Sequence, residues 1–298
     1  MRVLQWGWFA AAVLATGCVT TQQAEKRFTP GTKFQRTVSV GVGGQNIPLP
    51  DGVWEVAASK TTTNNHATPI LFVILFQEVN SRLSKAMYFS TPLSGDPNGV
   101  GYLESKTCRR DNMHYRITDE NVSGGDQDCR WVNHYRVTLK GSTTKLKGDA
   151  GEYLAKRGIS YPNHLIESGH RFADVSSFLN VHYYFSPDYD GFEDYRRTTW
   201  SDSPWHPQNT SGSDNKNQYI RRIRTWTDKW HGMVKAGFAG ALPTVSSVRS
   251  KPTVSAPNPA AKSGKVSERL ERLKKLMKDG LITKDEYDQK RQTILDSL

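Results

Sequence analysis

The feature that most constrains the fold of this chain is a run of seven apolar residues, Ile70–Phe76, with the sequence Ile-Leu-Phe-Val-Ile-Leu-Phe. Seven residues are too few to cross a bilayer as a helix, which needs roughly 20. The β-branched and aromatic content of the run favours an extended conformation with both faces buried. The run therefore predicts the central strand of a sheet.

Shorter patterns on both sides of this run predict further strands, each bounded by turn residues. The expected strands are Phe34–Val42, Val53–Ala57, Leu83–Phe89, Trp131–Leu139, and a hairpin of His164–Ala173 with Phe178–Phe185. Short turns between neighbours and few helices predict an α+β central domain, built on an antiparallel sheet, over residues 34–241.

Two helices are expected within this domain. Lys147–Arg157 places apolar residues on one face and is followed by Gly158, where a helix commonly ends. Asp214–Phe238 carries a single apolar stripe at spacings of three or four residues. The stripe comprises Tyr219, Ile223, Trp226, Trp230 and Val234. An aromatic stripe of this kind is more often part of a core than of a ligand site.

The first residues combine one early cation, Arg2, with an apolar stretch and small residues before Cys18. This layout is typical of a secretory signal peptide. A cysteine that follows Val13-Leu14-Ala15-Thr16-Gly17 resembles the lipobox of bacterial lipoproteins. The resemblance implies removal of residues 1–17 and a diacylglycerol thioether on Cys18. The residues also allow a short N-terminal helix with an incidental cysteine.

Lipidation at Cys18 implies a membrane as partner. Several acyl chains, at about 0.8 kcal/mol per buried methylene, make a lasting anchor. Val19 stands where Gram-negative lipoproteins of the inner membrane carry a retention aspartate, and this resemblance implies the periplasmic side of the outer membrane. Residues 18–33 are polar and are expected to form a tether.

Cys108 and Cys129 remain as an even pair once Cys18 is lipidated. In an oxidising compartment such a pair predicts one disulfide. For a loop of this length, the chain-entropy model gives a stabilisation of about 3 kcal/mol. The alternatives are two buried free thiols or a metal pair, and neither a CxxC spacing nor a further cysteine supports a metal.

The formal net charge is +11. A basic balance is compatible with nucleic acid, but an exported protein rarely meets any, so none is expected as a partner. An anionic lipid or an acidic wall polymer is the anionic partner within reach. The basic residues are dispersed, with short clusters such as Arg221-Arg222 and Lys274-Lys275, which favours a generally basic surface over a dedicated anion site.

The best catalytic or metal-ligating candidates are His164, His170, Asp174 and His182. A three-residue hairpin loop would place His170 opposite His182 and allow a metal pair. The hydrophobic pattern instead predicts a four-residue loop, Asp174–Ser177. That register turns one apolar set inward, namely Leu179, Val181, Tyr183, Phe185, Ile166 and Phe172. His170 then points inward and His182 outward, so they share no site.

From residue 242 the chain is rich in Pro, Ser, Ala, Thr and Lys, which predicts a disordered linker over 242–265. Ser267–Gly280 then has the pattern of a leucine-rich helix, and Thr283 and Glu286 are spaced as a capping box for a second one. The run Asp279–Tyr287 resembles the pattern D-G-L-I-T-x-x-E-[FY] of SHOCT domains. We expect such a domain over 266–298, and the family's association with oligomerisation implies an interaction role.

A two-helix hairpin of this size rarely has enough core to fold alone. Its apolar side chains therefore predict an interaction face for a second copy of the chain or another protein. This face comprises Leu270, Leu273, Met277, Leu281, Ile282, Tyr287, Ile294 and Leu295. The alternative is that the hairpin docks onto its own central domain.

No catalytic signature stands out in the sequence. It holds no paired carboxylates, nucleophile elbow, P-loop or zinc-protease spacing. We therefore expect no catalytic residue, metal or cofactor, and a non-catalytic binding or scaffolding role at the cell envelope. The alternative is an envelope hydrolase or metalloenzyme that uses the His170/His182 region.

Overall fold

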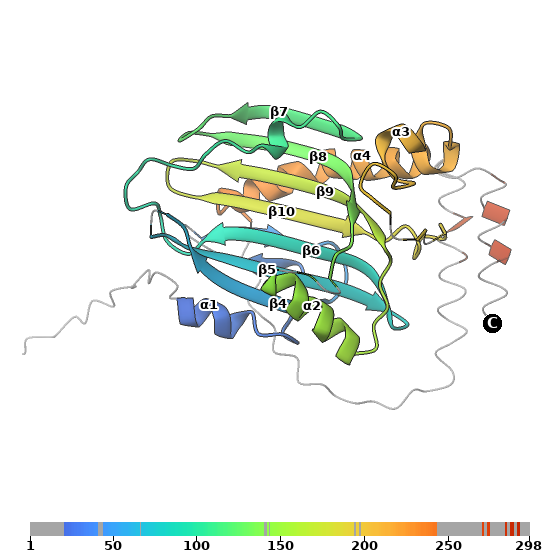
Figure 1. Ribbon diagram of the computed structural model, residues 1–298, viewed down its shortest axis with the longest axis horizontal. Helices are drawn as coiled ribbons and strands as arrows, with labels where there is room; N and C mark the ends of the chain where they lie inside the picture. The colour runs from blue at the N-terminus through green and yellow to red at the C-terminus, as the bar shows by residue number, and fades with distance from the viewer. Residues whose placement is uncertain are drawn as a thin grey trace, which may run out of the picture. The chain divides into compact units, whose positions relative to one another are not determined.

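The structure, a computed structural model, describes residues 21–40, 44–65, 67–139, 142, 144–193, 195–196 and 198–242, together with residues 270, 273, 274, 284, 287, 288, 291 and 292. The chain divides into two compact units, Met1–Val245 and Ser246–Leu298. In the first unit, eight strands form one sheet in the order β1-β4-β5-β6-β10-β9-β8-β7, and all neighbours are antiparallel (Figure 1).

The strands are β1 (Lys33–Phe34), β2 (Thr37–Ser39), β3 (Asn46–Pro48), β4 (Trp54–Thr63), β5 (Pro69–Val79), β6 (Arg82–Pro92), β7 (Tyr115–Asn121), β8 (Gln127–Arg136), β9 (His164–Ala173) and β10 (Phe178–Phe185). The helices are α1 (Thr21–Arg27), α2 (Lys145–Lys156), α3 (Pro207–Thr210) and α4 (Asp214–Phe238), with the 3-10 turn η1 (Thr107–Arg109). An antiparallel sheet with few helices confirms the predicted α+β class.

The apolar run Ile70–Phe76 lies in β5, between β4 and β6, which confirms the predicted central strand. Because side chains alternate along a strand, Leu71, Val73 and Leu75 enter the core on one face of the sheet. Phe76 enters a second core on the other face, with Ile74 packed against it. We call these the α4 face and the α2 face, after the helix on each side.

Helix α4 covers the α4 face, where it packs against β3, β8 and β9. Its bounds agree with the predicted helix, and Tyr219, Ile223 and Val234 of the expected stripe are buried. Gly237 lets the helix approach β3 closely, because a Cβ there would overlap the carbonyl oxygen of Asn46. The largest core cluster therefore lies between α4, α1 and the sheet.

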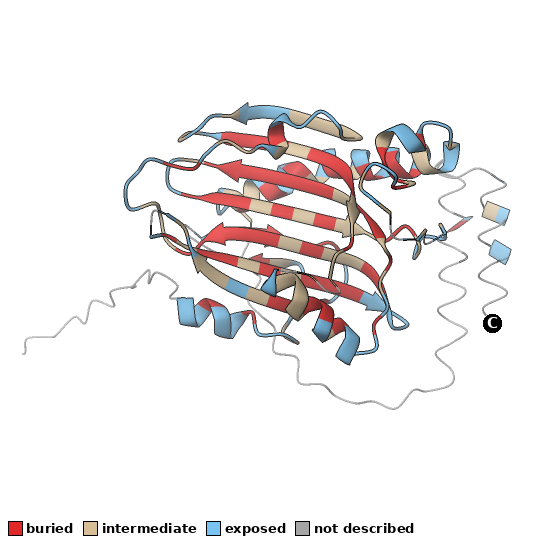
Figure 2. Ribbon diagram, viewed as in Figure 1, coloured by how far each residue is buried: buried red, intermediate tan, exposed pale blue. Residues whose placement is uncertain are grey.

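Helix α2 lies against β4 and β5 on the opposite side of the sheet, in front of the strands in Figure 1, while α4 runs behind them. Ala150 and Leu154 of α2 are buried against this face. The helix ends as expected, with Gly158 at a positive φ of 66°. Figure 2 shows the central strands largely buried, whereas the edge strand β7 is partly buried or exposed along its length.

The segment from Thr21 differs from the expected tether. It forms helix α1, and Ala24 and Phe28 are buried in the main core, so the folded domain begins before Phe34. Residues 1–20, with the predicted signal peptide and Cys18, lie outside the described residues. No helix in the described part of the chain is long and apolar enough to span a membrane.

The cysteine loop contains more structure than expected. A disulfide joins Cys108 to Cys129, which confirms the predicted pairing. Strand β7 lies within the loop and pairs with β8, so the disulfide fastens the segment that precedes the edge strand to the second strand of the sheet. Both cysteines are buried beside Trp131.

Candidate functional site

An apolar pocket lies between α2 and the α2 face of the sheet. Its volume is about 720 Å³, within the range of roughly 300–1,000 Å³ that is usual for small-molecule sites. We call it the α2 pocket. The strands supply Phe72, Ile74 and Phe76 from β5 and Ala86 and Tyr88 from β6, and α2 supplies Leu146 and Leu154. The sheet thus leaves part of its second face unfilled.

His182 lines the floor of the pocket, and Glu167 pairs with it from beneath the lining. The distance from His182 Nδ1 to Glu167 Oε1 is 3.0 Å, and Trp131 Nε1 donates to the same oxygen at 2.5 Å. Burial alone would raise the pKa of Glu167, but the electrostatic interaction with the His182 ring and the hydrogen bonds of His182 and Trp131 lower it. Glu167 therefore stays ionised and fixes the ring of His182.

Tyrosines surround this pair and keep the rest of the floor neutral. Tyr88 meets the His182 ring edge-to-face at 5.2 Å between centroids, and Tyr184 stacks on it at 6.2 Å. Burial raises the pKa of both phenols, so they remain protonated near neutral pH.

The rim of the α2 pocket is basic. Lys60, Lys145 and Lys147 are among its lining residues, which include no carboxylate in the described part of the chain. Two of these lysines have internal partners: Lys145 Nζ pairs with Asp149 at 2.8 Å, and Lys147 lies 5.3 Å from the centre of the Tyr135 ring. Apolar walls with a cationic rim are complementary to an amphipathic anion.

The histidines predicted as one region lie on opposite faces of the sheet. His170 pairs with Val181, and His182 with Gly169, across the hairpin of β9 and β10. The loop is Asp174–Ser177, so the register predicted from the hydrophobic pattern is confirmed and His170 does not face His182. Asp174 accepts hydrogen bonds from Ser176 and Ser177 within that loop.

His170 belongs to a buried chain of polar groups beneath α4. Its Nδ1 lies 3.1 Å from His231 Nδ1, and its Nε2 lies 3.2 Å from Ser168 Oγ. Thr227 donates to Ser168 Oγ at 2.7 Å, and His231 Nε2 lies 2.7 Å from Asp128 Oδ1. Burial lowers the pKa of His170 well below its usual range. Ser168 is fully buried, so this serine–histidine contact is closed to a substrate.

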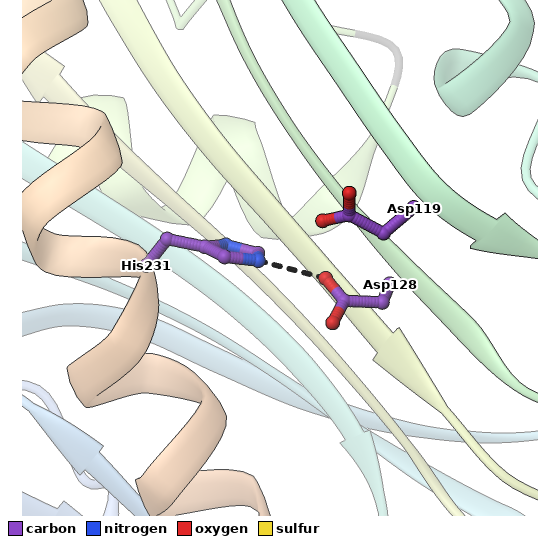
Figure 3. Close-up of side chains that lie close together, drawn as sticks. All are labelled: Asp119, Asp128 and His231. Carbon is purple, nitrogen blue, oxygen red and sulfur yellow. Dashed lines mark hydrogen bonds and ion pairs between the residues drawn. The ribbon is translucent and has the colours of Figure 1, made fainter.

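The carboxylate end of this series of buried polar groups resembles a metal site in geometry. Ligand atoms of Asp119, Asp128 and His231 lie within 4.8 Å of one another, with His231 reaching from α4 to Asp128 on β8 (Figure 3). However, Lys235 Nζ contacts Asp128 Oδ2 at 2.7 Å, and Arg130 contacts Asp119 at 3.0 Å. Each of these cations engages one oxygen of the two carboxylates, so the cluster is better described as an ion-pair network.

The predicted interaction face is described only in part. Leu270, Leu273 and Tyr287 are helical, and Leu273 is 6% exposed. The other members of the face lie outside the described residues, namely Met277, Leu281, Ile282, Ile294 and Leu295.

Sequence reasoning did not find the α2 pocket. The apolar residues Phe72, Ile74 and Phe76 indicated a buried strand, and nothing in the run distinguishes a filled face from a hollow one. The proximity of Glu167 to His182 depends on the register of β9 with β10, which places Glu167 opposite Tyr184. The only available signal was the outward direction predicted for His182.

Comparison with known proteins identifies only the end of the chain. No curated protein and no solved structure matches it. The family model named SHOCT, described as a short C-terminal domain, matches residues 268–295. This match lies within the predicted 266–298 and confirms the resemblance seen in Asp279–Tyr287. The C-terminal segment is therefore a SHOCT domain.

Proposed function

We propose that this chain is a lipid-anchored protein of the cell envelope whose central domain binds an apolar ligand without catalysis, and whose SHOCT domain contacts a partner. The α2 pocket carries the proposal. Its volume suits a small ligand, and its walls are mainly aromatic and aliphatic. An acyl chain would exclude water from this surface, and each methylene buried contributes about 0.8 kcal/mol.

The lipobox and the disulfide support the proposed location. Oxidation of Cys108 and Cys129 suits an exported protein, because thiols are kept reduced in the cytosol. Lipidation of Cys18 would hold the domain at a membrane, where acyl chains are abundant. Metabolic labelling with a fatty-acid analogue should tag the wild type and leave Cys18→Ala untagged, whereas equal labelling would refute the anchor.

Ligand binding can be tested with the chain from Val19 onward, exported behind a cleavable leader so that the disulfide forms. A dansyl-labelled undecanoate should bind with a saturable rise in fluorescence. Ala86→Trp should weaken binding at least tenfold, because the indole would fill the α2 pocket. Val175→Trp places the same side chain on an exposed turn, 54% accessible in the wild type, and should bind normally.

Circular dichroism would establish that both variants are folded. Saturable binding that survives in folded Ala86→Trp would place the ligand elsewhere. An absence of binding to the wild type would contradict the proposed function itself.

A second candidate function, a hydrolase, is favoured by one observation. His182 lines the α2 pocket, and Glu167 holds its Nδ1, an arrangement in which Nε2 can act as a general base toward water. Turnover of a p-nitrophenyl acyl ester that is lost in His182→Gln would establish this activity. Equal background rates with both proteins would leave the pocket as a binding site.

A further inference from the structure

A second cavity lies beside the α2 pocket on the same face of the sheet. Its volume is about 600 Å³, and Phe72 lines both cavities. The residues Ile70, Tyr102 and Phe178 give it apolar walls, and Arg171 is its one charged lining residue in the described part of the chain. We call it the Arg171 cavity.

Arg171 is buried without a counter-ion among the described residues. Arg171 is 7% exposed, and none of the ion pairs among the described residues involves it. Its Nε donates to Gln127 Oε1 at 2.8 Å, and its Nη1 donates to Asn180 Oδ1 at 3.1 Å. Both acceptors are neutral amides, so they orient the guanidinium without cancelling its charge. Buried charges in proteins are normally paired, and this one has its positive charge unmatched.

Two carboxylates that influence the neighbouring Tyr102, those of Asp96 and Asp174, are engaged in their own loops. Asp96 accepts hydrogen bonds from the backbone N–H groups of Val100 and Gly101, at 3.1 and 2.9 Å. Asp174 accepts those of Ser176 and Ser177, at 2.7 Å each. Asp96 therefore holds Val100 and Gly101, two lining residues of the cavity, in place.

The aromatic walls hold the guanidinium in place. Arg171 Cζ lies 4.7 Å from the centre of the Phe178 ring, and Phe178 meets Tyr102 edge-to-face at 4.8 Å. Burial lowers the pKa of Arg171 to about 10, which leaves the side chain cationic at neutral pH. Burial raises the pKa of Tyr102 to about 12, so its hydroxyl stays protonated. The described lining of the cavity therefore presents a single fixed positive charge.

The rim of the Arg171 cavity includes two exposed apolar side chains beside the polar Asn65 and Ser123. Val100 is 55% and Leu103 is 82% exposed, and both line the cavity. A free inorganic anion would gain nothing from such a rim, whereas an acyl chain would bury it. One guanidinium also matches the single negative charge of a carboxylate, to which arginine donates in a bidentate manner.

We propose that Arg171 binds the carboxylate of a long-chain fatty acid whose acyl chain passes Phe72 into the α2 pocket. This inference rests on the proposed function, since it names the ligand class of the same pocket. Arg171 and Phe72 lie on strands separated by β10 and β6, which places them roughly 14 Å apart at the usual strand spacing of about 4.8 Å. An extended acyl chain of ordinary length spans such a distance.

Isothermal titration calorimetry of the chain from Val19 onward, with dodecanoate and with dodecanol below their aggregation limits, tests this assignment. The wild type should bind dodecanoate at least tenfold more tightly than dodecanol. Arg171→Gln should abolish that preference and leave the affinity for dodecanol unchanged. Arg221→Gln removes the same charge from an exposed position on α4, on the opposite face, and should behave as the wild type.

Thermal unfolding without ligand separates a binding role from a structural one. Arg171→Gln should melt at the same temperature as the wild type or higher, because it removes an unmatched buried charge. A variant that unfolds far more easily and loses both ligands would mark Arg171 as structural and overturn the inference.

The other outcomes separate the inference from the proposed function. Equal affinities of the wild type for acid and alcohol would reject the role of Arg171 while leaving the α2 pocket as a ligand site. Binding of neither compound would reject both proposals. Tighter binding of a lysophosphatidylglycerol of the same chain length than of dodecanoate would reject the carboxylate as the head group.

Discussion

At the level of single residues, the lack of a side chain at Gly169 determines the packing next to His182, a lining residue of the α2 pocket. Gly169 on β9 pairs with Trp131 on β8 and with His182 on β10. A Cβ at Gly169 would overlap the indole ring of Trp131. The absence of a side chain therefore lets the indole lie against β9, where its Nε1 reaches Glu167.

Gly169→Ala should force Trp131 out of this position. Overpacking of a filled core typically costs about 1–3 kcal/mol, so we expect a loss of that size in the free energy of unfolding. Urea denaturation followed by tryptophan fluorescence measures it. Gly232→Ala is the matched control, because nothing lies within 4 Å of its Cβ and alanine favours the interior of α4. A Gly169→Ala protein as stable as the wild type would refute this packing argument.

At the level of elements, α4 docks on the sheet through buried polar groups as well as through its apolar stripe. Thr227, His231 and Lys235 all reach partners on β8 or β9. His170, which faces them from β9, has a pKa lowered by burial and by the adjacent His231. This interface therefore favours a neutral imidazole.

The lowered histidine pKa values predict a loss of stability in mild acid. His170 is held neutral in the folded chain, and burial lowers the pKa of His134 to about 3. In the unfolded chain both histidines bind protons below about pH 6.5, whereas in the folded chain they stay neutral. The free energy of unfolding should thus fall as pH drops from 7 to 5, by up to about 1.4 kcal/mol per pH unit for each histidine. Asp128 and Glu167, with lowered pKa values, lose their contribution only below about pH 4.5.

His170→Gln should reduce this slope by the share of one histidine while lowering stability at pH 7, since the contacts with His231 and Ser168 are weakened. Denaturant titrations at several pH values between 5 and 7 measure both effects. A slope identical to that of the wild type would show that His170 is protonated in the folded chain.

The elements that the sequence predicted are those with a strong apolar period. Helix α4 has a complete stripe over 25 residues, and the hairpin of β9 and β10 has an inward set that allows one register. Helix α1 was not predicted, because only one of its seven side chains, that of Ala24, is buried, and one side chain makes no apolar period. Strand β7 is an edge strand without a buried residue, so it lacks alternation. The role proposed for Arg171 could not be predicted from the sequence, because the function of an isolated cation in a strand depends on the residues that surround it in the fold.

At the level of the whole molecule, the chain combines two compact units, and the division at Val245 falls inside the segment 242–265. The first unit holds the sheet and both cavities. The second contains the SHOCT domain. Independent units contribute almost additively to stability, so their roles can be separated by truncation.

Truncation before Val266 should lower the oligomeric mass and leave the melting temperature of the central domain within a few degrees. Leu273→Asp should reproduce the loss of association, because it would place an unpaired charge in an apolar interface. Light scattering and calorimetry on the same samples measure both quantities. A truncated protein that keeps its mass but melts far lower would identify the hairpin as a cap on its own domain.

In a chain lipidated at Cys18 as proposed, the early start of α1 would limit the distance between the folded domain and the bilayer. Only Val19 and Thr20 separate Cys18 from the helix. Even a fully extended chain spans at most about 3.6 Å per residue, so the linker between a lipidated cysteine and α1 would measure roughly 10 Å. Because Ala24 and Phe28 are buried in the core, α1 cannot unwind to lengthen this linker without disturbing the domain. An anchored copy would therefore stay within one headgroup layer of the lipid surface and could exchange an acyl chain with it without first diffusing away.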